Sequence, residues 1–231
     1  MRVTSLPGVA GALLFLGCQA GGSGTPVLDT NDQKASYAVG FNMWESLAAA
    51  GDHLDVQAMA AGIEDARAER DPRIAEAEIQ TVMDEFNRTL QAERESTRET
   101  ESVENREAGD AFLAQNGARE GVVTTGSGLQ YEVLRAGDGP RPTADDRVTI
   151  HYRGSLVDGT EFDSSYGGEP ATFAVGGVIP GFTEALQLMP VGSHYRIVIP
   201  GDIAYGVQGR APSIGPDATL VFEIELLEIG E

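Results

Sequence analysis

The sequence contains very little cysteine and histidine. Its 231 residues include one cysteine, Cys18, and three histidines, His53, His151 and His194. A single thiol excludes an intramolecular disulfide and a cysteine-based zinc or iron–sulfur site. The histidines are far apart in the chain and form none of the known metal-binding spacings. We therefore expect no metal site and no cofactor.

Basic residues are scarce as well. Lys and Arg number 16 against 36 Asp and Glu, so the net charge is 16 − 36 = −20 at pH 7. Affinity for nucleic acids and for anionic membrane surfaces comes from clustered Lys and Arg, so both kinds of partner are disfavoured. Hydrophobic residues make up 41% of the chain, which is enough for a packed core. The length accommodates one large domain or two small ones.

The N-terminal residues 1–24 have the pattern of a targeting segment. Arg2 precedes an apolar run over residues 9–17, which is shorter than the ~20 residues that a membrane-spanning helix needs. This pattern is typical of a secretory signal peptide. Cys18 directly follows the run, as in a bacterial lipobox, where the cysteine is lipidated; an exported protein with an incidental cysteine is the alternative. We expect export to the bacterial periplasm or outer membrane, with Cys18 as a possible lipid anchor.

Residues 25–120 predict a helical module. Apolar residues recur at helical spacing over residues 36–44, in a helix that is expected to end at Gly51. Asp55 is placed to cap a second helix over residues 56–68. A third helix is expected from about residue 75 to residue 115, with a length of ~60 Å. These three segments are rich in Ala, Glu and Arg.

The third predicted helix changes character along its length. Its first half carries an apolar stripe of Ile79, Val82, Met83, Phe86 and Leu90, whereas its middle has Val103 as its only large apolar residue. A helix that is polar on all sides buries no face and typically bridges two modules. The module has too little core to stand alone, which favours a homodimer through these helices. A monomeric three-helix cap is the alternative.

Residues 121–231 change to the alternating pattern of strands. Alternation predicts strands near residues 128–134, 148–152, 195–199 and 219–227, and Asp158-Gly159 signals a hairpin. Residues 182–189 are the one helical stretch. We therefore predict an α+β protein. An all-helical dimerisation module with a long connecting helix would precede a curved antiparallel sheet of five or six strands wrapped around one short helix.

Four motifs occur in order in this second half: HYRGSLVDGTEFDSSY, VIPGFTEALQLMPVG, IPGDIAYG and IGPDATLVFEIELLEI. Their order resembles the FKBP-type peptidyl-prolyl cis–trans isomerases. The segment GDAFLAQN before GVVTTGSGLQY is similar to the macrophage infectivity potentiator and FkpA-like bacterial subgroup. The resemblance covers about residues 35–230. After the predicted signal peptide and lipobox of residues 1–24, it implies a dimerisation domain with a linker helix over residues 25–120 and an isomerase domain over residues 121–231.

The resemblance also implies a proline-binding pocket. Phe182 would lie under the proline ring, the Tyr205 hydroxyl and the Ile179 N–H would bind substrate carbonyls, and Asp163 would face the rotating carbonyl or hold the polar side. The implied catalytic residues are Tyr152, Asp163 and Tyr205, and the implied substrate-binding residues are Phe162, Phe173, Val178, Ile179, Phe182, Ile214 and Phe222. Arg210 stands near a position where some relatives carry His. The alternative for each aromatic residue is a plain core position.

The implied reaction is rotation about an X–Pro amide in unfolded or nascent polypeptides of the cell envelope. The rotation barrier is ~18–20 kcal/mol, because amide resonance must be broken, and no nucleophile, base or metal is required. A dimeric holdase chaperone with a weak or silent FKBP-like binding domain is the main alternative. An acidic surface adhesin with a degenerate domain is a third, because fold does not imply function.

Overall fold

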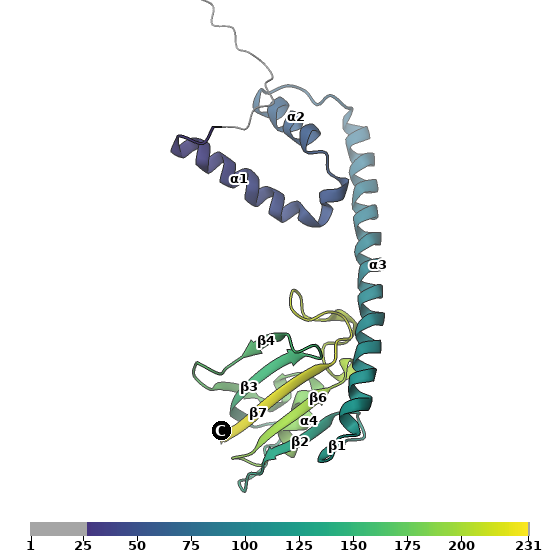
Figure 1. Cartoon of the computed structure of the whole chain (residues 1–231). Helices are drawn as coiled ribbons and strands as arrows, with labels where there is room; N and C mark the ends of the chain where they lie inside the picture. Colours follow the sequence, from purple (N-terminus) through teal and green to yellow (C-terminus); the bar gives the residue numbers. More distant parts are fainter. Residues whose placement is uncertain (1–26, 231) are drawn as a thin grey trace, which may run out of the picture. The chain divides into compact units, whose positions relative to one another are not determined.

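The computed structural model describes residues 27–230 of the chain (Figure 1). The predicted signal peptide and Cys18 lie outside these residues. Within the described residues the chain forms two compact units, residues 27–74 and residues 75–230. None of the helices within residues 27–230 has both the length and the apolar composition that crossing a membrane requires.

The first unit contains two short helices. They are α1 (Asn31–Leu47), which runs into a 3-10 turn (Ala48–His53), and α2 (Val56–Arg67). Thr30 caps α1 in a capping box with Gln33. Asp55 caps α2 as predicted, since its carboxylate accepts hydrogen bonds from two N–H groups of the first turn. No residue of α1 is buried, although the helix carries several large apolar side chains.

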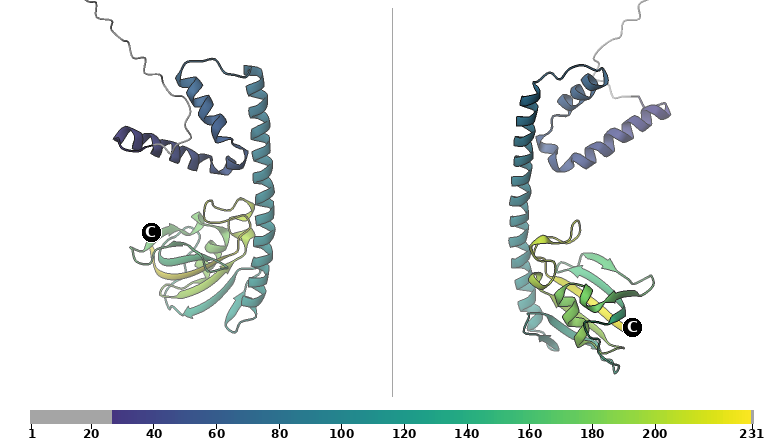
Figure 2. Two further views of the ribbon diagram at one scale, coloured as in Figure 1. Left: turned by 45° about the horizontal axis from the view of Figure 1, so that its top comes forward. Right: turned by 180° about the vertical axis from the view of Figure 1, so that it is seen from behind.

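The second unit begins with the long helix α3 (Glu76–Gly117), which confirms the predicted third helix. The C-terminal half of α3 lies along the sheet that follows it (Figures 1 and 2). Ser102, Gly109 and Asn116 are buried there. The prediction that the polar middle of this helix buries no face is therefore wrong, since Ser102 lies there. The side chains of Ser102 and Asn116 are accommodated in the interior because they form hydrogen bonds with the sheet domain.

The sheet is antiparallel and has seven strands in the order β1-β2-β6-β7-β3-β4, with β5 paired to β3. The strands are β1 (Val122–Thr124), β2 (Gln130–Arg135), β3 (Arg147–Leu156), β4 (Glu161–Ser164), β5 (Ala171–Ala174), β6 (His194–Ile199) and β7 (Leu220–Gly230). The prediction of five or six strands is too low, because β1 and β5 have only three and four residues, which is too short for a period to be recognised in the sequence. The predicted hairpin at Asp158-Gly159 joins β3 to β4.

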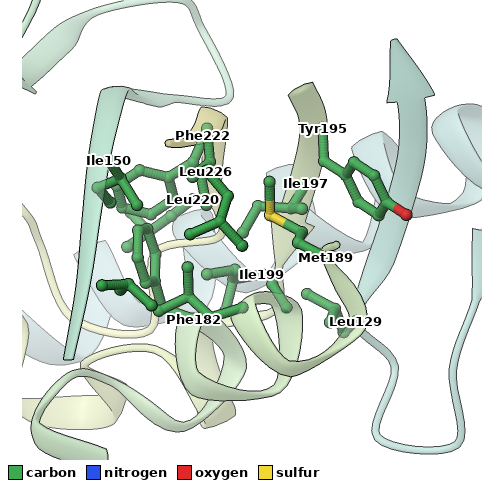
Figure 3. Close-up of a cluster of buried hydrophobic side chains, with 14 of the residues drawn as sticks. Leu129, Ile150, Phe182, Met189, Tyr195, Ile197, Ile199, Leu220, Phe222 and Leu226 are labelled. Carbon is green, nitrogen blue, oxygen red and sulfur yellow. The ribbon is translucent and has the colours of Figure 1, made fainter. Parts of the chain in front are cut away.

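The short helix α4 (Pro180–Leu188) packs on one face of this sheet. Phe182 and Leu186 of α4 are buried against inward side chains of β6 and β7, and Figure 3 shows Phe182 close to Leu220 and Phe222. Proline at the first position of α4 suits a helix start, since its missing N–H has no helical partner there. The core therefore holds α4 against the central strands.

Candidate functional site

A cavity of about 510 Å³ opens where α4 meets strands β3, β4, β5 and β7. Its lining is aromatic and aliphatic, with one acidic and one basic side chain. The lining residues are Tyr152, Phe162, Asp163, Phe173, Gly177, Val178, Ile179, Phe182, Tyr205, Arg210 and Phe222. All of the residues predicted for the pocket line it except Ile214. That residue is 3% exposed and lies in the hydrophobic core.

Two phenylalanines form the floor of the cavity. Phe182 and Phe222 are each 5% exposed, and their rings meet edge to face with centroids 5.1 Å apart. Phe162 meets Phe222 in the same manner at 5.6 Å. This geometry directs a positive ring edge at a negative ring face, which fixes the rings relative to one another. The floor is consequently rigid and apolar.

Gly154 on β3 makes this ring packing possible. A Cβ at residue 154 would lie 2.6 Å from Phe222 and 2.7 Å from Phe162. Only a residue without a side chain lets these rings approach the strand so closely. The glycine of the HYRG motif thus contributes to the shape of the cavity from behind the rings.

The acidic residue of the cavity has a partner within the cavity itself. The Tyr152 hydroxyl donates a hydrogen bond of 2.8 Å to Oδ2 of Asp163. Burial, together with this hydrogen bond to a carboxylate, raises the pKa of Tyr152 to about 12. Tyr152 is therefore protonated at neutral pH, and its ring meets Phe173 edge to face at 5.6 Å. The pair explains how a carboxylate is accommodated beside aromatic rings.

Tyr205 and Arg210 occupy the mouth of the cavity. The Arg210 guanidinium lies 5.9 Å from the centre of the Tyr205 ring, and Nη1 donates a hydrogen bond of 3.4 Å to the Tyr205 hydroxyl. The hydroxyl accepts in this bond, so its own proton stays available for a ligand. Arg210 was not among the predicted site residues. The sequence feature that could have pointed to Arg210 is its position in the loop directly after the IPGDIAYG motif.

The N-terminus of α4 presents a free backbone donor at the cavity wall. Ile179 precedes α4, and its carbonyl accepts hydrogen bonds from Phe182 and Thr183. Among residues 27–230, no acceptor is present for the Ile179 N–H. A ligand carbonyl can therefore bind there. Together with Tyr205, this gives the apolar cavity two hydrogen-bond donors for a peptide backbone.

The described part of the chain, residues 27–230, contains no group of three or more His, Cys, Asp or Glu side chains that could hold a metal ion. What the cavity offers is an apolar floor, aromatic walls, and two donors at its edges. Such a site can hold a flat, apolar five-membered ring while binding the flanking carbonyls.

Comparison with known proteins identifies two family domains. Residues 139–227 match the FKBP-type peptidyl-prolyl cis-trans isomerase model. Residues 32–133 match the domain amino terminal to FKBP-type peptidyl-prolyl isomerase. The first match includes every residue that lines the cavity, and the second includes the whole of α3.

Curated relatives cover most of the chain. The FKBP-type 22 kDa peptidyl-prolyl cis-trans isomerase of Escherichia coli is 44% identical over 207 residues, which span 89% of this chain and 98% of that protein. The outer membrane protein MIP of Legionella longbeachae is 39% identical over 203 residues, with 87% of each chain covered.

A solved structure agrees with these relatives. The crystal structure of FkpA from Escherichia coli matches with a TM-score of 0.67 and 36% identity, and covers 88% of this chain and 98% of that one. Sequence identity over nearly the full length, the cavity and the fold lead to one conclusion. This chain belongs to the family of FKBP-type peptidyl-prolyl cis-trans isomerases.

Proposed function

We propose that this protein is a peptidyl-prolyl cis–trans isomerase that accelerates X–Pro rotation in folding proteins of the cell envelope. The observation that carries the proposal is the aromatic cavity, with Phe182 as its floor and two backbone-binding donors at its edges. The names of the relatives, which are isomerases, favour this function over the holdase chaperone that the sequence left open.

The proposed mechanism is preferential binding of the twisted amide. At the top of the barrier the X–Pro bond has lost its resonance, and the carbonyl has lost part of its dipole. Transfer from water into an apolar cavity costs the polar planar amide more free energy than it costs the less polar twisted amide. The cavity therefore lowers the barrier without a nucleophile or a proton transfer.

The residues divide this work between ring binding and carbonyl binding. Phe182 and its neighbours hold the proline ring, while the Tyr205 hydroxyl and the Ile179 N–H bind carbonyls on either side. Asp163 accepts a hydrogen bond from the Tyr152 hydroxyl and so orients the polar wall toward the rotating carbonyl. Each of these roles is part of the proposal.

A protease-coupled peptide assay with matched variants tests these roles. Tyr205→Phe removes one hydrogen bond to substrate and should lower kcat/KM about three- to tenfold. Asp163→Ala removes the acceptor of Tyr152 and should act similarly. Tyr166→Phe is the control, because Tyr166 is exposed and its hydroxyl bonds to Glu225 outside the cavity. If both cavity variants keep the kcat/KM of the wild type, the roles assigned to Tyr205 and Asp163 are wrong.

The pH dependence tests the absence of proton transfer. Because the pKa of Tyr152 is raised to about 12, its hydrogen bond to Asp163 is fully present below the unfolded pKa of about 10 and is lost as pH rises through 12. We expect kcat/KM to stay flat from about pH 6 to about pH 9. A bell-shaped profile in this range would indicate acid–base catalysis and contradict the mechanism.

We also propose that the protein works in the envelope as a lipoprotein anchored through Cys18. One relative is named an outer membrane protein, which supports an envelope location. Mass spectrometry of the mature protein should find its N-terminus at Cys18 with attached acyl chains. An unmodified cysteine, or a cleavage site after it, would remove the anchor from the proposal.

A homodimer through the N-terminal helices completes the proposal. Large apolar side chains on α1 and α3 stay exposed in one copy, among them Phe41 and Met83. A second copy of the chain would bury them. Light scattering of the mature protein should give twice the mass of one chain.

Proline-containing unfolded polypeptides are the proposed substrates.

A further inference from the structure

The cavity mouth depends on a loop, residues 206–217, that follows Tyr205 and leads to β7. This segment, called the pocket loop below, carries Arg210 into the cavity lining. Its internal hydrogen bonds join Arg210 to Ile214 in both directions, at 2.7 and 3.0 Å, and Asp217 to Gly206 at 2.8 Å. These bonds shape the loop but tie it only to itself. Its position at the cavity therefore depends on contacts from other elements.

Helix α3 supplies such contacts to both arms of the pocket loop. Nη2 of Arg98 donates hydrogen bonds to the carbonyl oxygens of Val207 and Gln208, at 2.9 and 3.3 Å. Nδ2 of Asn105 donates to the carbonyl oxygen of Pro216 at 2.8 Å. The partners are about 110 residues apart in the chain, so these bonds attach one element of the unit to another. Both arms of the loop are held by the same helix.

A buried carboxylate makes the third attachment. Oγ of Ser102 donates a hydrogen bond of 2.6 Å to Oδ2 of Asp217, and Nη1 of Arg106 lies 3.6 Å from the same oxygen. Ser102 and Asp217 are each 8% exposed. A hydrogen bond to a buried charge is stronger than a neutral one, and a buried carboxylate without partners is costly. The end of the pocket loop is thus held against α3, because moving it away would leave the buried Asp217 carboxylate without these partners.

These attachments share one face of α3. Arg98, Ser102 and Asn105 are spaced i, i+4 and i+7, so they lie above one another on the helix. Gly109 continues the row, and a Cβ there would lie 2.3 Å from Oγ1 of Thr219. The missing side chain lets the helix backbone approach the segment just before β7. In Figures 1 and 2 the middle of α3 lies beside this loop in every view.

We propose that this face of α3 positions the pocket loop, and through it the substrate-binding groups Tyr205 and Arg210. Arg98, Ser102 and Asn105 are then positioning residues, and the amino-terminal family domain sets the substrate affinity of the isomerase domain. The proposal rests on the proposed function. The Tyr205 hydroxyl would bind the same substrate carbonyl whether the X–Pro amide is planar or twisted, so it stabilises the ground state and the transition state equally. A displaced loop should therefore raise KM and leave kcat nearly unchanged.

Full-length variants test the proposal in the peptide assay. Ser102→Ala combined with Asn105→Ala should raise KM about threefold or more, with kcat within about twofold of wild type. Amide hydrogen exchange over residues 206–217 should become faster in the same variant, while exchange in β3 stays unchanged. Ser96→Ala is the control, because Ser96 is exposed on the same helix and points away from this face. Ser102→Thr keeps a hydroxyl and should retain the wild-type KM.

The outcomes separate this proposal from the proposed function. Unchanged exchange over residues 206–217 in the folded double variant overturns it, as does faster exchange with an unchanged KM. If the wild type has no isomerase activity, the proposed function fails, and the exchange comparison alone decides whether α3 positions the loop. If the double variant does not fold, Asn105→Ala alone is measured against the same two criteria.

Discussion

The two halves of α3 carry residue rows of the same spacing and opposite chemistry. Ile79, Met83, Phe86 and Leu90 form an apolar row at i, i+4, i+7 and i+11, and Arg98, Ser102, Asn105 and Gly109 form a polar and small row at the same spacing. Met83 in the apolar row is 47% exposed and Leu90 in the same row is 8% exposed, as is Ser102 in the polar row. Hydrophobicity alone therefore does not decide which residues of this helix are buried.

The difference shows what holds a polar helix face in a protein interior. Each buried polar group of the second half has a partner in the sheet domain: Ser102 with Asp217, and Asn116 with Gln130 and Arg196. Burial of a polar side chain is tolerated when its hydrogen bonds are replaced, and glycine permits close approach without side-chain volume. In the first half, Val82 and Met83 stay about half exposed in one copy of the chain, which agrees with the proposed homodimer.

The largest expected effect comes from removing a buried amide of the polar half. Asn116 donates to Oε1 of Gln130 at 2.8 Å and accepts from Arg119 and Arg196, both at 2.9 Å. Asn116→Ala should lower the free energy of unfolding by about 2–3 kcal/mol, because it leaves these partners unpaired. Urea unfolding followed by circular dichroism measures the change.

Asn87→Ala provides the matched control, since Asn87 is exposed on the first half of the same helix. Its effect should lie within about 0.5 kcal/mol of zero. If the two substitutions lower the free energy of unfolding equally, the two halves of α3 do not differ in how their polar side chains are held.

A smaller effect is expected from adding one methyl group to the docked face. Gly109→Ala places a Cβ 2.3 Å from Oγ1 of Thr219, so the helix or the threonine must shift. We expect a loss of about 1–2 kcal/mol in the free energy of unfolding, despite the higher helix propensity of alanine.

Gly62→Ala in α2 is the comparison, because nothing lies within 4 Å of its added Cβ. That substitution should stabilise its helix by about 0.5–1 kcal/mol. If Gly109→Ala also stabilises the protein, the close packing of α3 on the sheet domain is refuted.

The smallest effect on the folded chain is expected at Met83, the exposed member of the apolar row. Met83→Gln should change the free energy of unfolding of an isolated chain by less than about 0.5 kcal/mol, because Met83 is half exposed. In the proposed homodimer the same change should weaken association, which light scattering over a dilution series detects. Unaltered association with this variant would exclude Met83 from the interface.

Much of the sheet could be predicted from alternation alone. Alternation predicted residues 148–152 of β3 and nearly all of β7, and the Asp158-Gly159 dipeptide predicted the hairpin that follows β3. The short strands β1 and β5 have too few residues for a period to appear, and they are held by pairing with β2 and β3. The hydrophobic pattern of a segment does not predict a strand that forms only because it pairs with a neighbouring strand.

The docking of α3 was missed for a related reason. Its contacts join residues about 110 positions apart, as between Asn105 and Pro216, and hydrogen-bond complementarity of this kind leaves no periodic signal. In the cavity, family motifs predicted most lining residues. Ile214 was expected to line the cavity and lies in the core. Arg210 entered the lining because the loop turns its side chain toward Tyr205.

Catalysis of X–Pro rotation is tested most directly in a refolding reaction that is limited by proline isomerisation. Uncatalysed, such a phase lasts tens to hundreds of seconds. We expect the mature protein, at a small molar fraction of the refolding chain, to speed this phase in proportion to its own concentration. If the slow phase stays unchanged, or responds only at equimolar protein as a holdase would require, the protein does not catalyse the rotation.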